Sequence, residues 1–600
     1  MVRRRINNWY YKKTGNKSIS FGLDLVRVYG CLLFTVLGID ACKDVDKKSH
    51  LQVFHYNEDV SVTTLDPAFV KSQSEIWIVS QIFNGLVDLN EQLQPIPALA
   101  KSWEFSNQNK TITFHLRRDA FFCFPGKEGK PAFKPLKSVD VVYSLSRIAD
   151  PLLASPGAWI FAEKLDQDLT KAFVAIDDST FQLNLLKPEA SMLNLLATNY
   201  GFVLSNAQMN VDNSIIGRHP IGTGPFFLRR WEEDIKLVLR KHPNYHEFDD
   251  KKIRLPYLDA VNVSFVKNKQ TAFMQFIAGS YDFFNGLEGS FKDELLTDSA
   301  TLKPKYSQKL KAIIVPFLNT EYIGCYMGDF PNKTNWLKDK NLRKALEFAI
   351  DKPRLVRFFR NGLGDAGTQG FTPPILLQNT QYNRMDTAAK STDKTLTLKT
   401  TPSQKAELFS EQEASFQRIK SAKAYFKQSG YARQPQKPIL TISTTPDYLD
   451  MVVFLQEAWG RIGIKVAIDI QTGGMLRQLR NEGKIELFRG SWIADYPDAE
   501  NYLACFYSPY HSPNGPNYTR YSNTDFDGLY RNIVSELGDN RADDIAKAND
   551  ILLADAPVIP LYYDKSIRLF HPWVLGLSND ASNRLILKQV RIKNSLSQTR

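Results

Sequence analysis

Apolar and polar positions alternate along several short stretches of this chain, as they do in half-buried strands. The alternation predicts strands at residues 111–117 (TITFHLR), 235–241 (IKLVLRK) and 260–266 (AVNVSFV). Elsewhere the apolar residues change to helical spacing. In TAFMQFIAGSYDFF, residues 271–284, this spacing predicts a helix that stops at Gly279.

Two longer stretches extend this mixture of elements. NLRKALEFAIDKPRLVRFFRNGLG, residues 341–364, predicts two helices that are separated around Pro353 and ended by Gly362. DYLDMVVFLQEAWGRIGIKVAID, residues 447–469, predicts a helix, a turn at Gly463 and a strand. Strands mixed with helices indicate an α/β protein. Because 600 residues exceed what one simple core holds, we expect two or three lobes.

One long stretch shows neither pattern. Residues 376–410 are rich in Thr, Lys, Gln and Ser, contain few apolar residues and have no period. Such a composition cannot bury enough apolar surface to offset the entropy of ordering the chain. We therefore expect a surface excursion at residues 376–410 that is partly disordered.

The composition is that of an ordinary soluble globular protein, with 43% hydrophobic and 23% charged residues. The net charge is +12, but the basic residues are spread along the chain and form no compact block beyond the N-terminus. This distribution argues against nucleic acid as a partner. Aromatic residues reach 12%, which suits large cores and equally suits pockets for varied side chains.

The sequence contains no recognised catalytic or cofactor motif. It has no GxSxG elbow, no HExxH pair, no Walker A loop and no Rossmann glycine fingerprint. Cys123, Cys325 and Cys505 are single and widely spaced, which indicates neither a disulfide framework nor a zinc site. We expect no enzyme activity, no cofactor and no bound metal.

The N-terminal segment has three parts. Residues 1–17 are basic, residues 28–39 form an apolar run shorter than a membrane span, and the next residues complete LGIDAC at Cys42. This arrangement resembles a bacterial lipoprotein signal, in which lipid is attached to the Cys that becomes the mature N-terminus. We expect residues 1–41 to be removed and Cys42 to be lipidated, although Asp40 departs from the usual pattern. The alternative is an uncleaved membrane anchor.

Five segments follow one another in an informative order: LAKSWEFSNQNKTITFHLRRDAFF (99–122), PIGTGPFFLRRW (220–231), NLRKALEFAIDKPRLV (341–356), RIGIKVAI (461–468) and SWIADYPDAENYL (491–503). This series resembles the family 5 extracellular solute-binding proteins, which are the oligopeptide-, dipeptide- and nickel-binding receptors of ABC importers. The resemblance covers residues 51–573, nearly all of the expected mature chain.

The resemblance implies an α/β fold of the type II periplasmic-binding-protein class, from the large cluster with an extra subdomain. Two lobes are joined by a hinge and enclose the solute between them. The resemblance also implies the limits of the two lobes and of the subdomain. Lobe I comprises residues 42–97, 220–312 and 564–600, the subdomain comprises residues 98–219, and lobe II comprises residues 313–563 with the surface excursion 376–410.

The resemblance also implies the binding residues. In peptide-binding relatives the Asp of a Trp-x-x-Asp motif binds the peptide α-ammonium, and here that residue is Asp495. Arg489 takes the position of an Arg that meets a peptide carboxylate, and Trp492 takes that of a Trp lining a side-chain pocket. The residues alone leave plainer alternatives open, because Asp495 could be an ordinary turn carboxylate and Arg489 a surface strand residue.

The implied function is that of a solute-binding receptor, which captures short peptides and delivers them to an ABC permease in the cytoplasmic membrane. We expect a lipid-anchored monomer in the periplasm or at the cell surface. A different solute on the same fold remains open, such as a cell-wall peptide, a nickel chelate or a sugar. An exported enzyme is a further alternative, which the missing catalytic motifs disfavour. Asp495 favours a peptide, because an uncharged sugar gives its carboxylate no partner.

Overall fold

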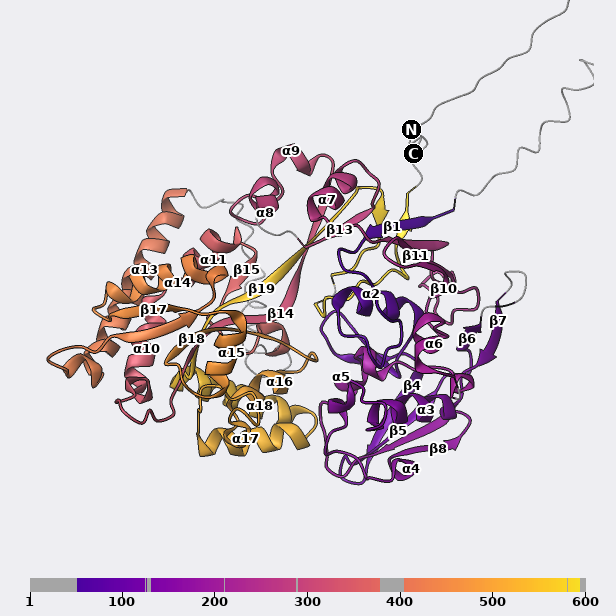
Figure 1. Cartoon of the computed structure of the whole chain (residues 1–600), viewed down its shortest axis with the longest axis horizontal. Helices are drawn as coiled ribbons and strands as arrows, with labels where there is room; N and C mark the ends of the chain where they lie inside the picture. Colours follow the sequence, from indigo (N-terminus) through magenta and orange to yellow (C-terminus); the bar gives the residue numbers. More distant parts are fainter. Residues whose placement is uncertain are drawn as a thin grey trace, which may run out of the picture. The chain divides into compact units, whose positions relative to one another are not determined.

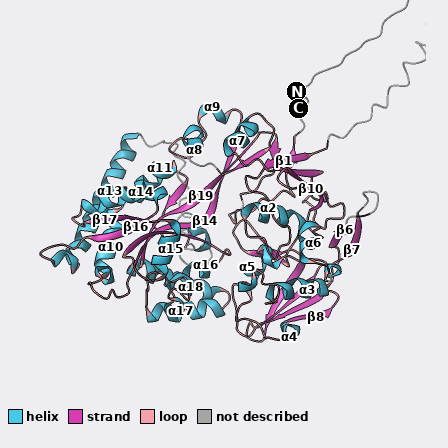
Figure 2. Cartoon of the chain, viewed as in Figure 1, coloured by secondary structure: helices cyan, strands magenta, loops and turns pink. Residues whose placement is uncertain are grey.

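The protein is described by a computed structural model, which covers residues 51–124, 126, 131–209, 211–286, 290–377, 404–579 and 581–593. The signal-like segment 1–41 and Cys42 lie outside the described residues. Residues from Gln52 onward belong to one compact unit, and the architecture below is that of this unit. Figure 2 shows helices and strands interspersed throughout it, which confirms the predicted α/β class.

One mixed sheet links lobe I to lobe II. Strand β15 (Gly364–Ala366) pairs with β19 beside the main path. Across the sheet the other strands follow the order β10 (Phe226–Glu232), β11 (Lys236–Lys241), β12 (Ala260–Ser264), β1 (Val53–Asn57), β13 (Phe283–Asn285), β19 (Val558–Phe570), β14 (Lys311–Cys325), β18 (Leu487–Ile493), β16 (Leu440–Thr444) and β17 (Val466–Ile470).

The two longest strands, β14 and β19, form the connection between the lobes. They run antiparallel beside each other (Figure 1). Strand β14 has 15 residues and β19 has 13. One end of β19 pairs with β13 of lobe I, whereas the other end of β14 pairs with β18 of lobe II. The register of this strand pair shifts between Pro316 and Thr320, near the middle of β14. Such a shift bends and twists a strand pair locally, which makes this stretch the expected hinge.

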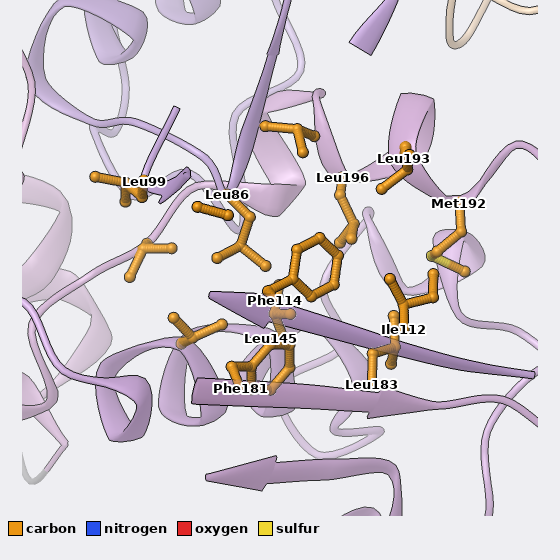
Figure 3. Packing of buried hydrophobic residues seen from close by; sticks show 14 of the residues in the cluster. Leu86, Leu99, Ile112, Phe114, Leu145, Phe181, Leu183, Met192, Leu193 and Leu196 are labelled. Carbon is orange, nitrogen blue, oxygen red and sulfur yellow. The ribbon is translucent and has the colours of Figure 1, made fainter. Parts of the chain in front are cut away.

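The subdomain has a sheet and a core of its own. Its strands pair in the order β4 (Ala100–Ser106), β5 (Thr111–Leu116), β9 (Thr180–Asn184) and β8 (Phe173–Asp177). Figure 3 shows Ile112 and Phe114 of β5 beside Phe181 and Leu183 of β9, packed with Leu145 in one buried layer. Leu145 comes from helix α3 (Ser138–Ala149). Buried side chains at every second strand position explain the alternation seen in the sequence.

Helices flank these sheets, and three two-stranded ribbons complete the fold. The ribbons are β2 (Val87–Leu89) with β3 (Pro95–Pro97), β6 (Phe121–Phe124) with β7 (Ala132–Pro135), and β20 (Val574–Leu575) with β21 (Arg591–Ile592). The helices of lobe I and the subdomain are α2 (Gln73–Ile82), α4 (Leu169–Ala172), α5 (Met192–Leu196), α6 (Asn213–Arg218), α7 (Lys269–Ile277), α8 (Ser290–Leu295) and α9 (Pro304–Ser307). Those of lobe II are α10 (Lys340–Ala349), α11 (Lys352–Arg360), α13 (Gln404–Gln428), α14 (Leu449–Gly460), α15 (Gly473–Asn481), α16 (Ala499–Leu503), α17 (Thr524–Ser535) and α18 (Asp539–Asp555).

The predicted helices around Pro353 are confirmed. Helix α10 ends at Ala349, and α11 begins after the N-cap residue Asp351, whose side chain accepts a hydrogen bond from the Arg354 amide. Pro353 lies in the first turn of α11, where its missing N–H costs nothing. The predicted strands at 111–117, 235–241 and 260–266 correspond to β5, β11 and β12, and the helix before Gly279 corresponds to α7.

The expected excursion at residues 376–410 needs correction at both ends. Leu377 belongs to a short 3-10 turn, Pro374–Leu377, and its side chain is buried in the lobe II core. At the other end, Gln404 already begins helix α13. The Lys, Ala, Glu and Leu residues after position 404 have high helix propensity, which favours this helix despite the polar composition. Residues 378–403 lie outside the described part of the chain. Within the described ranges, no helix combines the length and the apolar character needed to cross a bilayer.

Candidate functional site

The three predicted binding residues lie on one continuous segment that runs from strand β18 into helix α16. Strand β18 is held on both sides, because it pairs antiparallel with β14 and parallel with β16. In the β14 register, Arg489 lies opposite Ile323 and Ser491 lies opposite Glu321. Side chains two residues apart share one face of a sheet, so Arg489 and Glu321 are diagonal neighbours.

Arg489 and Glu321 form a buried ion pair. The Arg489 Nε donates to Glu321 Oε2 at 2.8 Å, and Nη2 donates to Oε1 at 2.6 Å. The guanidinium carbon also lies 3.4 Å from the centroid of the Tyr448 ring. Only 3% of the Glu321 side chain is exposed, and this burial raises the pKa of its carboxyl against the opposing effect of Arg489. Arg489 is therefore already matched in charge, although no described residue accepts a hydrogen bond from its Nη1.

Asn501 ties the end of β18 to the turn that follows. Its Oδ1 accepts a hydrogen bond from Trp492 Nε1 at 3.0 Å and a longer one from the Asp495 backbone N–H at 3.4 Å. The Asp498 side chain caps α16 by accepting from the Glu500 amide at 2.8 Å, which orients the first turn that carries Asn501. The half-buried Trp492 ring packs against the lobe II core. Trp492 and Asp495 thus have a fixed relative placement.

Asp495 is a carboxylate of this segment without an ion-pair partner among the described residues. Its side chain is exposed, and it forms no ion pair with any residue that the structure describes. The protein packed around the turn nevertheless raises the pKa of its carboxyl, and Asn501 opposes this effect. Burial raises the pKa of the Tyr200 hydroxyl in the subdomain, and the nearby Asp495 charge adds to this rise. Asp495 therefore lies near the subdomain as an acceptor without a cation.

The turn after Asp495 makes direct contact with the subdomain. The Tyr496 ring stacks on Trp159 with a centroid distance of 5.8 Å. Asn194 Nδ2 donates to the Pro497 carbonyl at 2.7 Å. A second contact lies nearby, where Arg541 Nη2 donates to Ser191 Oγ at 3.1 Å and to Asp498 at 2.8 Å. These polar contacts and the aromatic stack join lobe II to the subdomain around the candidate site.

A cavity of about 230 Å³ lies beside these contacts. All three parts of the unit line it. Lobe I contributes residues 92–95, the subdomain contributes Ala190 and Asn194, and lobe II contributes residues 497–499 among others. A space bounded by several bodies changes shape when those bodies move, which is the arrangement expected of a receptor that closes on its solute.

The structure does not gather the three predicted side chains at one point. Arg489 and Trp492 are three positions apart on β18 and so project from opposite faces of the sheet, whereas Trp492 and Asp495 share the partner Asn501. None of the three lines the cavity described above.

The structure also adds partners that the sequence reasoning missed. Glu321, Tyr448 and Asn501 fix Arg489, Trp492 and the turn before α16. Only Glu321 left a signal in the sequence, because it is the single charged residue in the strand segment IIVPFLNTEYIGC. The described residues contain no group of three or more His, Cys, Asp or Glu side chains suited to a metal ion.

Comparisons with known proteins identify the family and the fold. The profile of the bacterial extracellular solute-binding proteins, family 5, matches residues 94–514. The periplasmic murein peptide-binding protein MppA of Escherichia coli is 27% identical, covering 86% of this chain and 88% of that protein. The dipeptide-binding protein DppE of Bacillus subtilis is 23% identical, covering 94% and 96%. The structure of HbpA2 from Haemophilus parasuis superposes with a TM-score of 0.73 at 20% identity, covering 90% of this chain and all of that one. The predicted fold class is confirmed.

Proposed function

Because this chain belongs to the bacterial extracellular solute-binding proteins of family 5, we propose that it captures short peptides and delivers them to the permease of an ABC importer. Proteins of this family bind solutes and are not enzymes. The observation that carries the proposal is Asp495, a carboxylate to which no described residue offers a cation, beside the contact between lobe II and the subdomain. A peptide supplies the missing cation as its α-ammonium group.

The peptide amino end binds at Asp495 through a charge-assisted hydrogen bond, which contributes about 1.5–3 kcal/mol. The bond strengthens when the lobes close, because closure excludes water and lowers the local dielectric. Trp492, held by Asn501, forms one wall for a peptide side chain. Main-chain pairing of an extended peptide is indifferent to its side chains, so the receptor accepts varied sequences.

The peptide carboxylate binds Arg489 in this proposal, as the family resemblance implies. Only the Nη1 group of Arg489 is open to it, since Nε and Nη2 already donate to Glu321. The Glu321 charge offsets that of Arg489, so the attraction for a carboxylate is weaker than a free guanidinium would give. We therefore expect the amino end at Asp495 to contribute more to affinity than the carboxyl end at Arg489.

Mass spectrometry of the solute released by denaturing the purified protein tests this function. A mixture of short peptides is expected, because recognition through the main chain tolerates many sequences. A single non-peptide compound, such as a nickel chelate or a sugar, would overturn the peptide assignment and leave the fold as a receptor for another solute. If nothing is released, titration calorimetry with a series of di- to pentapeptides decides, and no heat with any of them rejects the proposal.

We also propose that the mature protein is a monomer anchored in the periplasm or at the cell surface by lipid on Cys42. The basic segment, the short apolar run and LGIDAC support this placement. Metabolic labelling with a fatty acid and N-terminal sequencing test it. Wild-type protein should carry label and begin at Cys42, and Cys42→Ala should accumulate as an unlabelled precursor. Normal cleavage of the Cys42→Ala variant would contradict lipidation.

A further inference from the structure

A second cavity lies in lobe I, at one edge of the main sheet. Strands β1 and β13 are parallel neighbours, with Tyr56 opposite Phe283, so their carboxyl ends meet at the same edge. Glu58 follows β1 directly, and Asn285 is the last residue of β13. Both residues line a cavity of about 210 Å³, which is closed on other sides by the first turns of α2 and α7.

Glu58 is buried, and only one of its two carboxylate oxygens has a hydrogen-bond partner among the described residues. The residue is 8% exposed, and its Oε2 accepts a hydrogen bond from Ser74 Oγ at 2.6 Å. Its Oε1 has no hydrogen-bond partner among the described residues. The buried Asn285 Oδ1 is likewise without a donor. Most buried polar atoms in proteins are paired, so two unpaired acceptors in one cavity indicate a ligand that brings its own donors.

The charges around the cavity leave a negative excess. Lys269 and Asp59 also line it, and Lys269 Nζ lies 3.3 Å from Asp59 Oδ2, so these two charges balance. Among the residues that the structure describes, the Glu58 charge has no such counter-ion. Burial raises the pKa of the Glu58 carboxyl to about 7, Asp59 adds to the rise, and the Ser74 hydrogen bond opposes it. A bound cation would oppose this rise, because an opposite charge nearby favours the ionised carboxylate.

We propose that this cavity binds a primary alkylammonium group, with Glu58 as its counter-ion and Asn285 as a second acceptor. The ammonium supplies three donors to the two unpaired oxygens. Ala272, Phe284 and the Trp77 ring line the same space and suit the methylene chain, and an aromatic face also attracts a cation. The volume suffices, since a cavity of about 150 Å³ already holds a benzene molecule. One carboxylate and one amide oxygen are too few ligands for calcium, which takes about six to eight oxygens.

The group can reach the cavity from two sources. It is the side chain of a lysine-like residue in a captured peptide, which rests on the proposed function, or it is the end of a free amine. Both sources present the same methylene chain and ammonium. They differ in whether Glu58 affects peptide binding, and the experiment below separates them.

The first measurement uses n-butylammonium chloride and the full-length protein, followed by ligand-observed NMR. Saturable binding is expected, with n-butanol of nearly equal size not binding. Glu58→Gln should weaken butylammonium binding about tenfold or more, because a charge-assisted bond is lost. Glu104→Gln makes the same change at an exposed carboxylate and should leave the affinity unaltered. No saturable binding to the wild type, or equal affinity in Glu58→Gln, would overturn the proposal.

The second measurement compares two tripeptides that differ only in lysine or norleucine at one position, scanned over the three positions. If a peptide side chain is the source, Glu58→Gln weakens the lysine peptide about tenfold at one position and leaves the norleucine peptide unchanged. If both peptides bind both proteins equally while butylammonium still requires Glu58, the ligand is a free amine. If no peptide binds at all, the peptide function fails, but the butylammonium result still decides the assignment of this cavity.

Discussion

Glu321 in lobe II and Glu58 in lobe I are both almost fully buried carboxylates, but their surroundings differ. Glu321 receives two good hydrogen bonds from Arg489, whose guanidinium lies over the Tyr448 ring. Glu58 receives one hydrogen bond from Ser74, and its other oxygen lines a cavity without a partner in the described part of the chain. Burial raises the pKa of both carboxyls.

The difference separates a charge that serves the fold from one that is open to a ligand. A buried charge with a complete set of partners positions its strand. Removing one member of a buried ion pair leaves the remaining charge without compensation for its desolvation. A buried charge without partners lowers stability until a ligand matches it. By this criterion the Glu321–Arg489 pair supports β18, whereas the buried Glu58 is open to a cation. Asp495 is exposed, so the criterion would apply to it only in the closed complex that we propose.

The largest expected effect comes from breaking the paired site. Arg489→Met leaves Glu321 buried without its cation, and we expect the free energy of unfolding to fall by about 3–5 kcal/mol. Chemical denaturation followed by far-UV circular dichroism measures this change. The variant should also lose stability more steeply as pH rises, because Glu321 then ionises in a buried site without the Arg489 cation to stabilise its charge.

The control for this prediction removes both charges. Arg489→Met combined with Glu321→Leu should recover most of the lost stability, since replacing a whole buried pair by apolar residues is often neutral or stabilising. Equal losses in the single and double variants would mean that packing of the Arg489 side chain on Tyr448, and not the charge pair, supports this strand.

Removing the Glu58 charge should raise the free energy of unfolding, whereas breaking the Glu321–Arg489 pair should lower it. The folded-state pKa of Glu58 is about 7, against an ordinary value of 4.5. The folded protein therefore holds more protons than the unfolded chain between these pH values, and stability is lost as pH rises through this window. Glu58→Gln avoids the loss, so at pH 8 we expect it to be about 3 kcal/mol more stable than the wild type and at pH 4 about equal.

Thermal and chemical denaturation at pH 4, 6 and 8 test this difference. Glu189, at the contact between the subdomain and lobe II, also has a pKa raised to about 7, chiefly by burial. It remains in both proteins, so each keeps some decline with pH, and only the difference between them reports on Glu58. A variant less stable than the wild type at pH 8 would show that the Glu58 charge is matched in the folded protein.

The sequence predicts those features whose causes are local. The breaks around Pro353 and the stop at Gly279 follow from residues within one turn, and the structure confirms them. The pairing of Glu321 with Arg489 joins residues 168 positions apart, and the cavity of Glu58 and Asn285 depends on two strands meeting at one edge. Such contacts arise from strand order, which no local pattern encodes. Helix α13 was missed for another reason, because its start lies in a polar stretch without apolar periodicity.

The exposed carboxylate gives the third test, which concerns binding and leaves stability nearly unchanged. Asp495→Ala removes the acceptor for the peptide α-ammonium, and the loss of one charge-assisted bond should weaken peptide binding roughly a hundredfold. N-acetylated peptide should bind the wild type poorly, and the variant should discriminate much less between the two forms. Calorimetry with both peptides and both proteins decides, because equal losses for free and acetylated peptide would show that Asp495 does not hold the amino end.

The smallest effect is expected from an uncharged contact. Trp159 of the subdomain stacks on Tyr496 of lobe II, next to Asp495, with an angle of 26° between the ring planes. Such an aromatic pair contributes about 0.5–1.5 kcal/mol beyond its buried area. Trp159→Ala should therefore weaken peptide binding about two- to tenfold, mainly through faster dissociation, because the stack helps to hold the subdomain against lobe II.

Phe358→Ala is the matched control, since this aromatic side chain is 75% exposed on α11. It should alter neither affinity nor dissociation rate in stopped-flow measurements. If Trp159→Ala behaves like this control, the stack plays no part in binding. If Trp159→Ala weakens binding as strongly as Asp495→Ala, the neutral contact contributes as much to peptide affinity as the charged one. The difference between matched and unmatched carboxylates would then not determine affinity at this site. The expected ordering, Asp495 well above Trp159, follows because a cation withdrawn from water depends on its counter-charge more than two rings depend on each other.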